Sequence, residues 1–144
     1  MVSRESPTKR SDFKSFRRFT TRWADNDAYG HVNNTVFYQW FDSAVNGWLV
    51  EKGLLNIQDG DPIALVVETR CAYFTPIEFP HDVEVGLAVV QLGKSSVRYR
   101  IGVFPIGDHN AAAQGEFIHV LVDRGSRRPV EIPANWRRAL EAIS

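Results

Sequence analysis

Residues 34–52 constrain the fold of this 144-residue chain more than any other segment. Apolar side chains recur there at helical spacing and cover a wide stripe over about five turns; they are Val36, Phe37, Trp40, Phe41, Ala44, Val45, Trp48 and Leu49. Gly53 follows, where the C-terminus of a helix often places a glycine. A helix with so wide an apolar stripe must be buried, so the rest of the chain has to supply the surface that covers it.

The segments around this helix are typical of β-strands. They are rich in Val, Thr, Tyr and Phe, and they cover residues 13–23 before the helix and 63–74, 83–92, 96–104 and 111–122 after it. Turns at 76–80, 93–94 and 105–110 favour an antiparallel meander, and residues 133–143 favour a short closing helix. The sequence therefore predicts an α+β fold in which a curved antiparallel sheet of about five strands wraps a long central helix.

Composition restricts the class of protein further. The 44% hydrophobic content, the 24% charged content and the formal net charge of +0 suit one globular domain, predicted over residues 13–144, and argue against a chain that coats nucleic acid. Residues 1–12 are polar and predicted to be a flexible tail. No apolar run is long enough to span or insert into a membrane, and the start lacks a signal-peptide run, so we expect a cytoplasmic protein. The lone Cys71 excludes an intramolecular disulfide, and the histidine spacing predicts no metal site.

The two ends of the chain are more basic than its middle. Residues 1–18 contain six basic and two acidic residues, and residues 124–138 contain five arginines and one acid, Glu131. One interpretation is that both ends are simply solvated. The other is that they form basic patches for a polyanionic ligand, such as the phosphates of a nucleotide-derived cofactor.

The segment that points to chemistry is 22–34, Arg-Trp-Ala-Asp-Asn-Asp-Ala-Tyr-Gly-His-Val-Asn-Asn, which joins the first strand to the helix. Asn33 or Asn34 suits a helix N-cap, and the unpaired N–H groups of the first turn form a partial positive pole that can stabilise a developing negative oxygen. Asp27 lies just upstream, where a carboxylate could attack a polarised carbonyl or activate a water molecule. Gly30 lets the backbone bend. The alternative, purely structural interpretation is that Asp27 only caps a turn.

This segment resembles the signature of the hotdog-fold thioesterases, in the branch that resembles 4-hydroxybenzoyl-CoA thioesterases. The resemblance is carried by eight positions at fixed spacing: Arg22, Asp25, Asp27, Gly30, His31, Val32, Asn33 and Asn34. The turn at residues 93–96 also resembles one found near coenzyme A (CoA) in that family. The resemblance implies a hotdog fold and an acyl-CoA thioesterase that hydrolyses its substrate to free acid and CoA. It implies no cofactor, because CoA is part of the substrate.

The resemblance also implies residue roles. Asp27 corresponds to the catalytic carboxylate, as general base or nucleophile, and the backbone N–H of Asn34 would polarise the thioester carbonyl. His31 would line the same pocket or hold the loop. For Asp25 the residues themselves favour a structural role, in which it hydrogen-bonds the loop or pairs with Arg22. The residues implied to contact the substrate are Gly30, Asn33, Tyr29, Lys94, Ser95 and Ser96.

Family members form dimers with active sites at the subunit interface, so the resemblance implies a homodimer or a homotetramer. Two alternatives stay open. The acyl group could be carried by an acyl carrier protein in place of CoA, or the chain could be a non-catalytic module that binds acyl groups. The identity of the acyl group also stays open.

Overall fold

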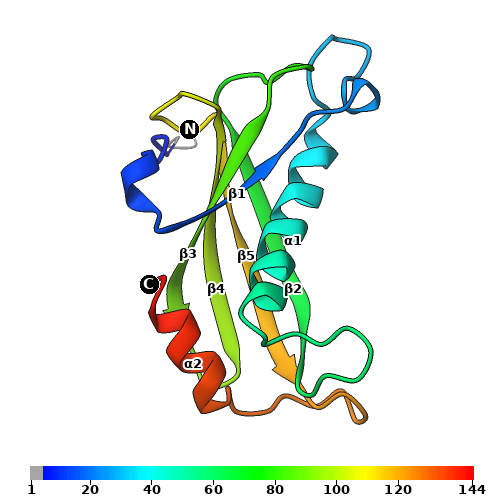
Figure 1. Cartoon of the computed structure of the whole chain (residues 1–144), viewed down its shortest axis with the longest axis vertical. Helices are drawn as coiled ribbons and strands as arrows, with labels where there is room; N and C mark the ends of the chain where they lie inside the picture. Colours follow the sequence, from blue (N-terminus) through cyan, green and yellow to red (C-terminus); the bar gives the residue numbers. More distant parts are fainter. Residues whose placement is uncertain (1–4) are drawn as a thin grey trace.

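The computed structural model of the protein describes residues 5–144. A five-stranded antiparallel sheet curves around one long helix (Figure 1), which confirms the predicted α+β architecture. The elements are η1 (Arg10–Asp12), β1 (Ser15–Phe19), η2 (Trp23–Asp25), α1 (Asn34–Glu51), β2 (Ile63–Tyr73), β3 (Val83–Leu92), β4 (Ser96–Pro105), β5 (Ala113–Val122) and α2 (Ala134–Glu141), where η1 and η2 are 3₁₀ turns.

The order of the strands across the sheet is β1-β3-β4-β5-β2. The predicted meander is confirmed for β3, β4 and β5, which pair antiparallel with their neighbours in sequence. β2 departs from it, because it pairs with β5 and forms the edge of the sheet. The connection over residues 74–82 therefore passes across one end of the sheet before β3 begins. That end is where α1 begins, since the Tyr73 hydroxyl donates a hydrogen bond to the Asn34 carbonyl oxygen at 2.8 Å.

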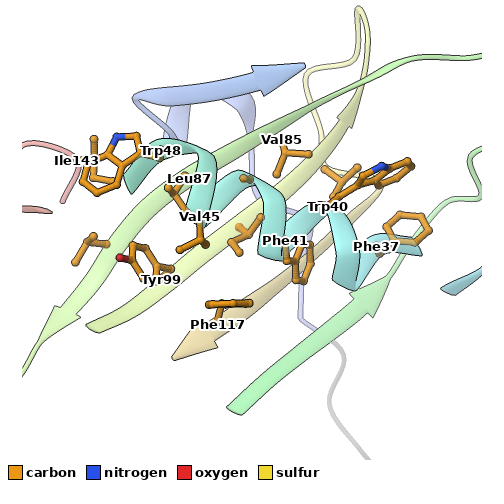
Figure 2. Packing of buried hydrophobic residues seen from close by; sticks show 14 of the residues in the cluster. Phe37, Trp40, Phe41, Val45, Trp48, Val85, Leu87, Tyr99, Phe117 and Ile143 are labelled. Carbon is orange, nitrogen blue, oxygen red and sulfur yellow. The ribbon is translucent and has the colours of Figure 1, made fainter. Parts of the chain in front are cut away.

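The apolar stripe of α1 packs against the concave face of the sheet, as its spacing predicts. All eight of its members are buried, and Figure 2 shows Phe37, Phe41 and Val45 between the helix and the strands. The helix approaches β5 closely at Gly115, where a Cβ atom would lie 2.6 Å from Cε2 of Phe41 and 1.9 Å from the Arg70 carbonyl oxygen. A side chain does not fit there, so Gly115 permits this packing.

Residues 5–13 cross the opposite face of the sheet before β1 begins. Phe13 and Phe16 pack edge-to-face around Phe104 of β4, and the Arg10 guanidinium lies 5.2 Å from the rings of both Phe16 and Phe104 while it pairs with Glu84 at 2.9 Å. Residues 5–12 thus have a defined place on the sheet. The flexible tail predicted over residues 1–12 stays a prediction, and residues 1–4 lie outside the described residues.

The first strand differs from its prediction. β1 ends at Phe19, whereas the sequence predicted a strand as far as Trp23. The physical reason is local: the Asp25 carboxylate accepts a hydrogen bond from the Arg22 backbone N–H at 2.8 Å, which closes η2. Trp23 consequently leaves the sheet and is 80% exposed.

The other boundaries agree with the predictions to within two residues. Gly53 has φ +72°, in the left-handed region that glycine adopts readily. Trp136 and Leu140 of α2, followed by Ile143, complete the same buried cluster as Trp48. Figure 2 shows Ile143 and Trp48 of this cluster. In the part of the chain that the structure describes, no helix is long and apolar enough to cross a membrane.

Candidate active site

The segment between β1 and α1 begins with an ion pair. The Asp25 side chain is buried and accepts hydrogen bonds from Nε and Nη2 of Arg22 at 3.0 and 2.7 Å. These bonds raise the pKa of the Arg22 guanidinium above its usual value, first through the hydrogen bond itself and then through the attraction of the carboxylate. The expected structural role of Asp25 is confirmed, because both of its oxygens are used inside the loop.

Residues 26–32 then form a miniature hairpin. Asn26 and Val32 make an isolated antiparallel bridge, and the Asp27 N–H donates to the His31 carbonyl oxygen at 2.9 Å. The turn is closed by the Gly30 N–H, which donates to the Asp27 carbonyl oxygen at 3.0 Å. Gly30 has φ +81°, and a Cβ atom there would meet no heavy atom within 4 Å. Glycine is therefore favoured at this position by its backbone angle and not by crowding.

The Asp27 carboxylate is half-buried and faces the same turn. Its Oδ1 atom accepts a hydrogen bond from the Tyr29 N–H at 2.9 Å. This bond caps the turn, as the purely structural interpretation of Asp27 expects. Within residues 5–144, Oδ2 has no hydrogen-bond partner. One oxygen thus fixes the side chain while the other is available to a ligand, so turn capping and catalysis are compatible for Asp27.

The hairpin is joined directly to the start of α1. Asn33 is the N-cap, and its Oδ1 atom accepts from the Thr35 N–H at 2.9 Å. The Asn33 N–H donates to the Asp25 carbonyl oxygen at 2.8 Å, which ties the segment before Asp27 to the tip of the helix. Asn34 is the first helical residue, and its N–H has no partner among the described residues. An unpaired amide at the positive end of an 18-residue helix is therefore available to an anionic oxygen.

Tyr73 of β2 contacts the first turn of α1. Its hydroxyl donates to the Asn34 carbonyl oxygen, and its ring meets Phe37 edge-to-face at 5.1 Å. Burial raises the pKa of Tyr73, so the hydroxyl stays protonated and continues to donate. This hydrogen bond was not predicted from the sequence. The available signal was weak, because it consisted of one hydroxylated aromatic residue at the end of an apolar strand.

The predicted site residues divide into two groups. Asp27, Gly30, His31, Asn33 and Asn34 lie together in the hairpin and the helix tip. Tyr29 lies at the apex of the turn and is 86% exposed, and the His31 side chain is also exposed. The site of a single chain is consequently open to solvent.

Lys94, Ser95 and Ser96 lie at the other end of the sheet. Ala113 pairs with Tyr73 and Val103 at the helix-tip end, whereas Ser96 pairs with Val120 at the far end of β4. A strand advances about 3.3 Å per residue, which separates this turn from Asn34 by roughly 20 Å within one chain. One subunit alone thus does not bring the two groups of predicted site residues together.

No metal cluster accompanies this loop in the described residues. Across residues 5–144, no group of three or more His, Cys, Asp or Glu side chains converges in a way that could hold an ion. The expectation of hydrolysis without a metal or cofactor stays a prediction. The segment from Asp27 to Asn34 carries one carboxylate and one helix N-terminus, two groups that suit attack on a polarised carbonyl.

Comparison with known proteins gives a consistent result. A sequence model of the thioesterase-like superfamily matches residues 21–140, which include the hairpin and all of α1. A search against curated protein sequences gave no significant match.

Solved structures similar to this chain include three that cover most of it. The PA5185 protein of Pseudomonas aeruginosa shares 48% identity over 97% of this chain and 97% of that chain, with a TM-score of 0.92. The PA2801 protein of the same species, described as a candidate thioesterase, shares 27% identity over 86% and 95% of the two chains, with a TM-score of 0.81. Slr0204 of Synechocystis, a 1,4-dihydroxy-2-naphthoyl-CoA thioesterase, shares 21% identity over 87% and 93%, with a TM-score of 0.77, and so shows a common fold.

Proposed function

Because this chain belongs to the thioesterase-like superfamily, we propose that it hydrolyses an acyl-CoA thioester to the free acid and CoA. The observation that carries the proposal is the joined hairpin and helix tip. It supplies an available oxygen on Asp27 and an unpaired N–H on Asn34, and hydrogen bonds hold both on the same short segment. Addition to a thioester carbonyl needs this pair of groups, because the carbon must be attacked while its oxygen gains negative charge.

In the first route, Asp27 acts as a general base. The thioester carbonyl oxygen accepts the hydrogen bond of the Asn34 N–H, and the helix pole stabilises the charge that develops on it. Asp27 takes a proton from water as the water oxygen bonds to the carbonyl carbon. The C–S bond then breaks, the carboxylic acid forms, and the CoA thiolate leaves and is protonated.

In the second route, Asp27 is the nucleophile. Its free oxygen bonds to the carbonyl carbon, the C–S bond breaks and CoA leaves as the thiolate, which is protonated. The mixed anhydride on Asp27 is then hydrolysed by water. His31, which lies at the end of the same hairpin, is proposed to contact the substrate, as are Gly30 and Asn33. The exposed Tyr29 is proposed to shape the entrance.

The test is thiol release from a panel of short, long, branched and aryl acyl-CoAs by the parent protein and by Asp27→Asn. The amide keeps the size of the side chain and the acceptor for the Tyr29 N–H, but it removes the charge. We expect kcat to fall by about a hundred- to ten-thousandfold, the usual contribution of general acid–base catalysis.

The matched control is Asp59→Asn, because Asp59 is an exposed acid in the loop between α1 and β2. We expect its kcat to stay within twofold of the parent. Undiminished turnover by Asp27→Asn would refute the mechanism. Binding without thiol release across the whole panel would favour a non-catalytic module, and a much higher kcat/KM with the same acyl group on a carrier protein would favour the acyl carrier protein as substrate.

The exposure of the site in a single chain also supports the presence of a partner subunit that would complete it. β2 is an edge strand with its outer backbone groups unpaired by any described strand, and Leu65, Val66 and Val67 are 36%, 45% and 60% exposed. A long apolar edge of this kind is a template for pairing with another strand. We therefore include in the proposal a homodimer, alone or as half of a tetramer, in which two β2 strands pair antiparallel.

Such pairing would account for the residues at the far end of the sheet. The Tyr73 end of one β2 would lie beside the Ile63 end of the other, and Ile63 is next to the last residues of β5. The partner's Lys94, the partner's Ser95 and the partner's Ser96 would then lie at the end of the joined sheet that holds Asp27. Lys94 is exposed in the single chain, so its charge would be available to the phosphates of CoA.

Val67→Lys tests this part of the proposal, because a charge on the edge disfavours strand pairing. By light scattering coupled to gel filtration, we expect Val67→Lys to shift the protein toward the monomer and to lower kcat/KM. Val90→Lys changes an exposed valine on β3 and serves as the control. A monomeric parent with full activity would contradict the shared site.

A further inference from the structure

We propose that Asn26 is a positioning residue, whose side chain clamps the Asp27 hairpin onto the connection between β2 and β3. The inference rests on the proposed function, since it concerns the residue that orients Asp27. The Asn26 Oδ1 atom accepts a hydrogen bond from the Phe79 backbone N–H at 3.1 Å. Asn26 also stands between the buried, fully paired Asp25 and the half-buried Asp27.

The clamp has two arms. Asn26 begins the miniature hairpin and reaches Phe79, while Val32 ends the hairpin and its N–H donates to the Ile77 carbonyl oxygen at 2.7 Å. Asn26 and Val32 are themselves bridged. Both legs of the hairpin are therefore fastened to residues 77–79, with the Asp27 turn projecting beyond them.

The connection to which the hairpin is fastened is itself anchored to the rest of the fold. Ile77 is buried in the main apolar cluster, as is Val32. The connection is tied down at its start by the Thr75 N–H, which donates to the Ala112 carbonyl oxygen at 3.1 Å, and at its end by the Asp82 carbonyl oxygen, which accepts from the Ile106 N–H at 3.1 Å. The strand order explains its position, because the chain must cross this end of the sheet to pass from β2 to β3.

An aromatic contact adds to the clamp on the side of η2. The Trp23 ring meets the Phe79 ring edge-to-face at 5.9 Å and 87°. The Asn26 amide acts closer to the site, because Asn26 directly precedes Asp27, whereas Trp23 lies four residues before it. Loss of the amide acceptor would leave a backbone N–H at Phe79 unpaired and let the Asp27 oxygen move relative to the Asn34 N–H. Small displacements of this kind reduce turnover, because attack needs a defined geometry.

The test uses two variants of the full-length protein. Asn26→Leu is close in shape but has no acceptor, whereas Asn26→Asp keeps an acceptor oxygen. For Asn26→Leu we expect faster hydrogen exchange at the Phe79 and Val32 amides and a kcat lower by about 3- to 10-fold, in line with one lost hydrogen bond. KM should change by less than twofold. Asn26→Asp should restore the exchange protection.

Asn56→Leu is the matched control, because the Asn56 Oδ1 atom also accepts a backbone N–H at 3.1 Å, from Gln58, but in the loop after α1. We expect no change in kcat for this variant. Parental exchange and parental kcat in Asn26→Leu, or a failure of Asn26→Asp to restore protection, would overturn the proposal. The exchange measurement needs no substrate, so the clamp can fail or succeed independently of the thioesterase activity. Absence of thiol release by the parent protein would instead refute the proposed function.

Discussion

Residues 25–33 and residues 36–49 follow one another in the chain, yet different forces hold them. The first segment is fixed by hydrogen bonds, most of them between groups close in sequence, such as Arg22 with Asp25 and Asp27 with Tyr29, and two of them to residues 77–79. The second is fixed by apolar contacts with strands far away in sequence. The geometry of the site and the stability of the fold therefore depend mainly on different residues. Substitutions in the helix should chiefly change stability, and substitutions in the loop should chiefly change turnover.

The largest expected effect on stability is that of Phe41→Ala. The Phe41 ring is fully buried and packs where β5 carries Gly115, so its loss leaves a cavity that the glycine does not fill. We expect the free energy of unfolding to fall by about 3–5 kcal/mol, measured by urea denaturation. Val50→Ala, on the exposed side of the same helix, is the control and should cost about 0.5 kcal/mol or less. A loss below 1 kcal/mol for Phe41→Ala would contradict the conclusion that the apolar contacts of the helix hold the fold.

The same contrast explains what the sequence could predict. The stripe of α1 and the β3–β4–β5 meander follow from local periodicity, and the pairing of Asp25 with Arg22 follows from two opposite charges three residues apart. Element boundaries depend on single hydrogen bonds, which is why β1 ends before Trp23.

Non-local placement could not be predicted in the same way. Nothing in the composition of β2 indicates that it pairs with β5 and forms an edge, so neither the Tyr73 hydrogen bond to Asn34 nor the Asn26 hydrogen bond to Phe79 was foreseeable. The large distance between Lys94 and Asp27 within one chain was likewise not foreseeable, because it depends on how the strands are placed in the sheet. Their proposed meeting depends on a second copy, and one sequence carries no signal for the register of that contact.

His119 is a polar side chain inside the apolar layer, so its ionisation tests how the core is held. It is 1% exposed, its ring meets Phe117 and Tyr99 edge-to-face, and its Nδ1 atom has no hydrogen-bond partner within residues 5–144. Burial lowers its pKa from 6.5 to about 4. The unfolded chain therefore binds a proton at a higher pH than the folded one, and stability falls as pH decreases from 6.5 to about 4. The loss amounts to about 3 kcal/mol.

This pH effect is measured by urea denaturation at several pH values between 7 and 4. His119→Phe should flatten the dependence in that window, whereas His109→Gln, which changes an exposed histidine, should keep the parental slope. An unchanged slope in His119→Phe would assign the acid sensitivity to other groups.

Asp25→Asn tests the loop with a smaller expected effect. The buried carboxylate of Asp25 accepts from the exposed Arg22 side chain and from the Arg22 N–H, and the amide can keep only part of this set. Because solvent screens the Arg22 guanidinium, we expect a loss of about 1–2 kcal/mol in the free energy of unfolding. We also expect a fall in kcat well below that of Asp27→Asn.

Asp12→Asn is the control for Asp25→Asn, since Asp12 closes the exposed turn η1 in the same way through the Lys9 N–H at 2.8 Å. Its effect on stability should stay within about 0.5 kcal/mol. An equal loss in the two variants would mean that burial of Asp25 contributes nothing.

The smallest expected effect is on the chemical reactivity of Cys71. Cys71 is half-buried in β2, and burial raises the pKa of its thiol from 9.0 to about 11. Since the thiolate is the species that reacts, alkylation by iodoacetamide at pH 8 should be about a hundredfold slower than for an unperturbed thiol, and its rate should still rise at pH 10. A plateau near pH 9, measured by mass spectrometry, would contradict this.

Cys71 pairs with Gly115, against which Phe41 packs. Phe41→Ala should therefore accelerate the alkylation, whereas Asp25→Asn should leave its rate unchanged if loop and core are held independently.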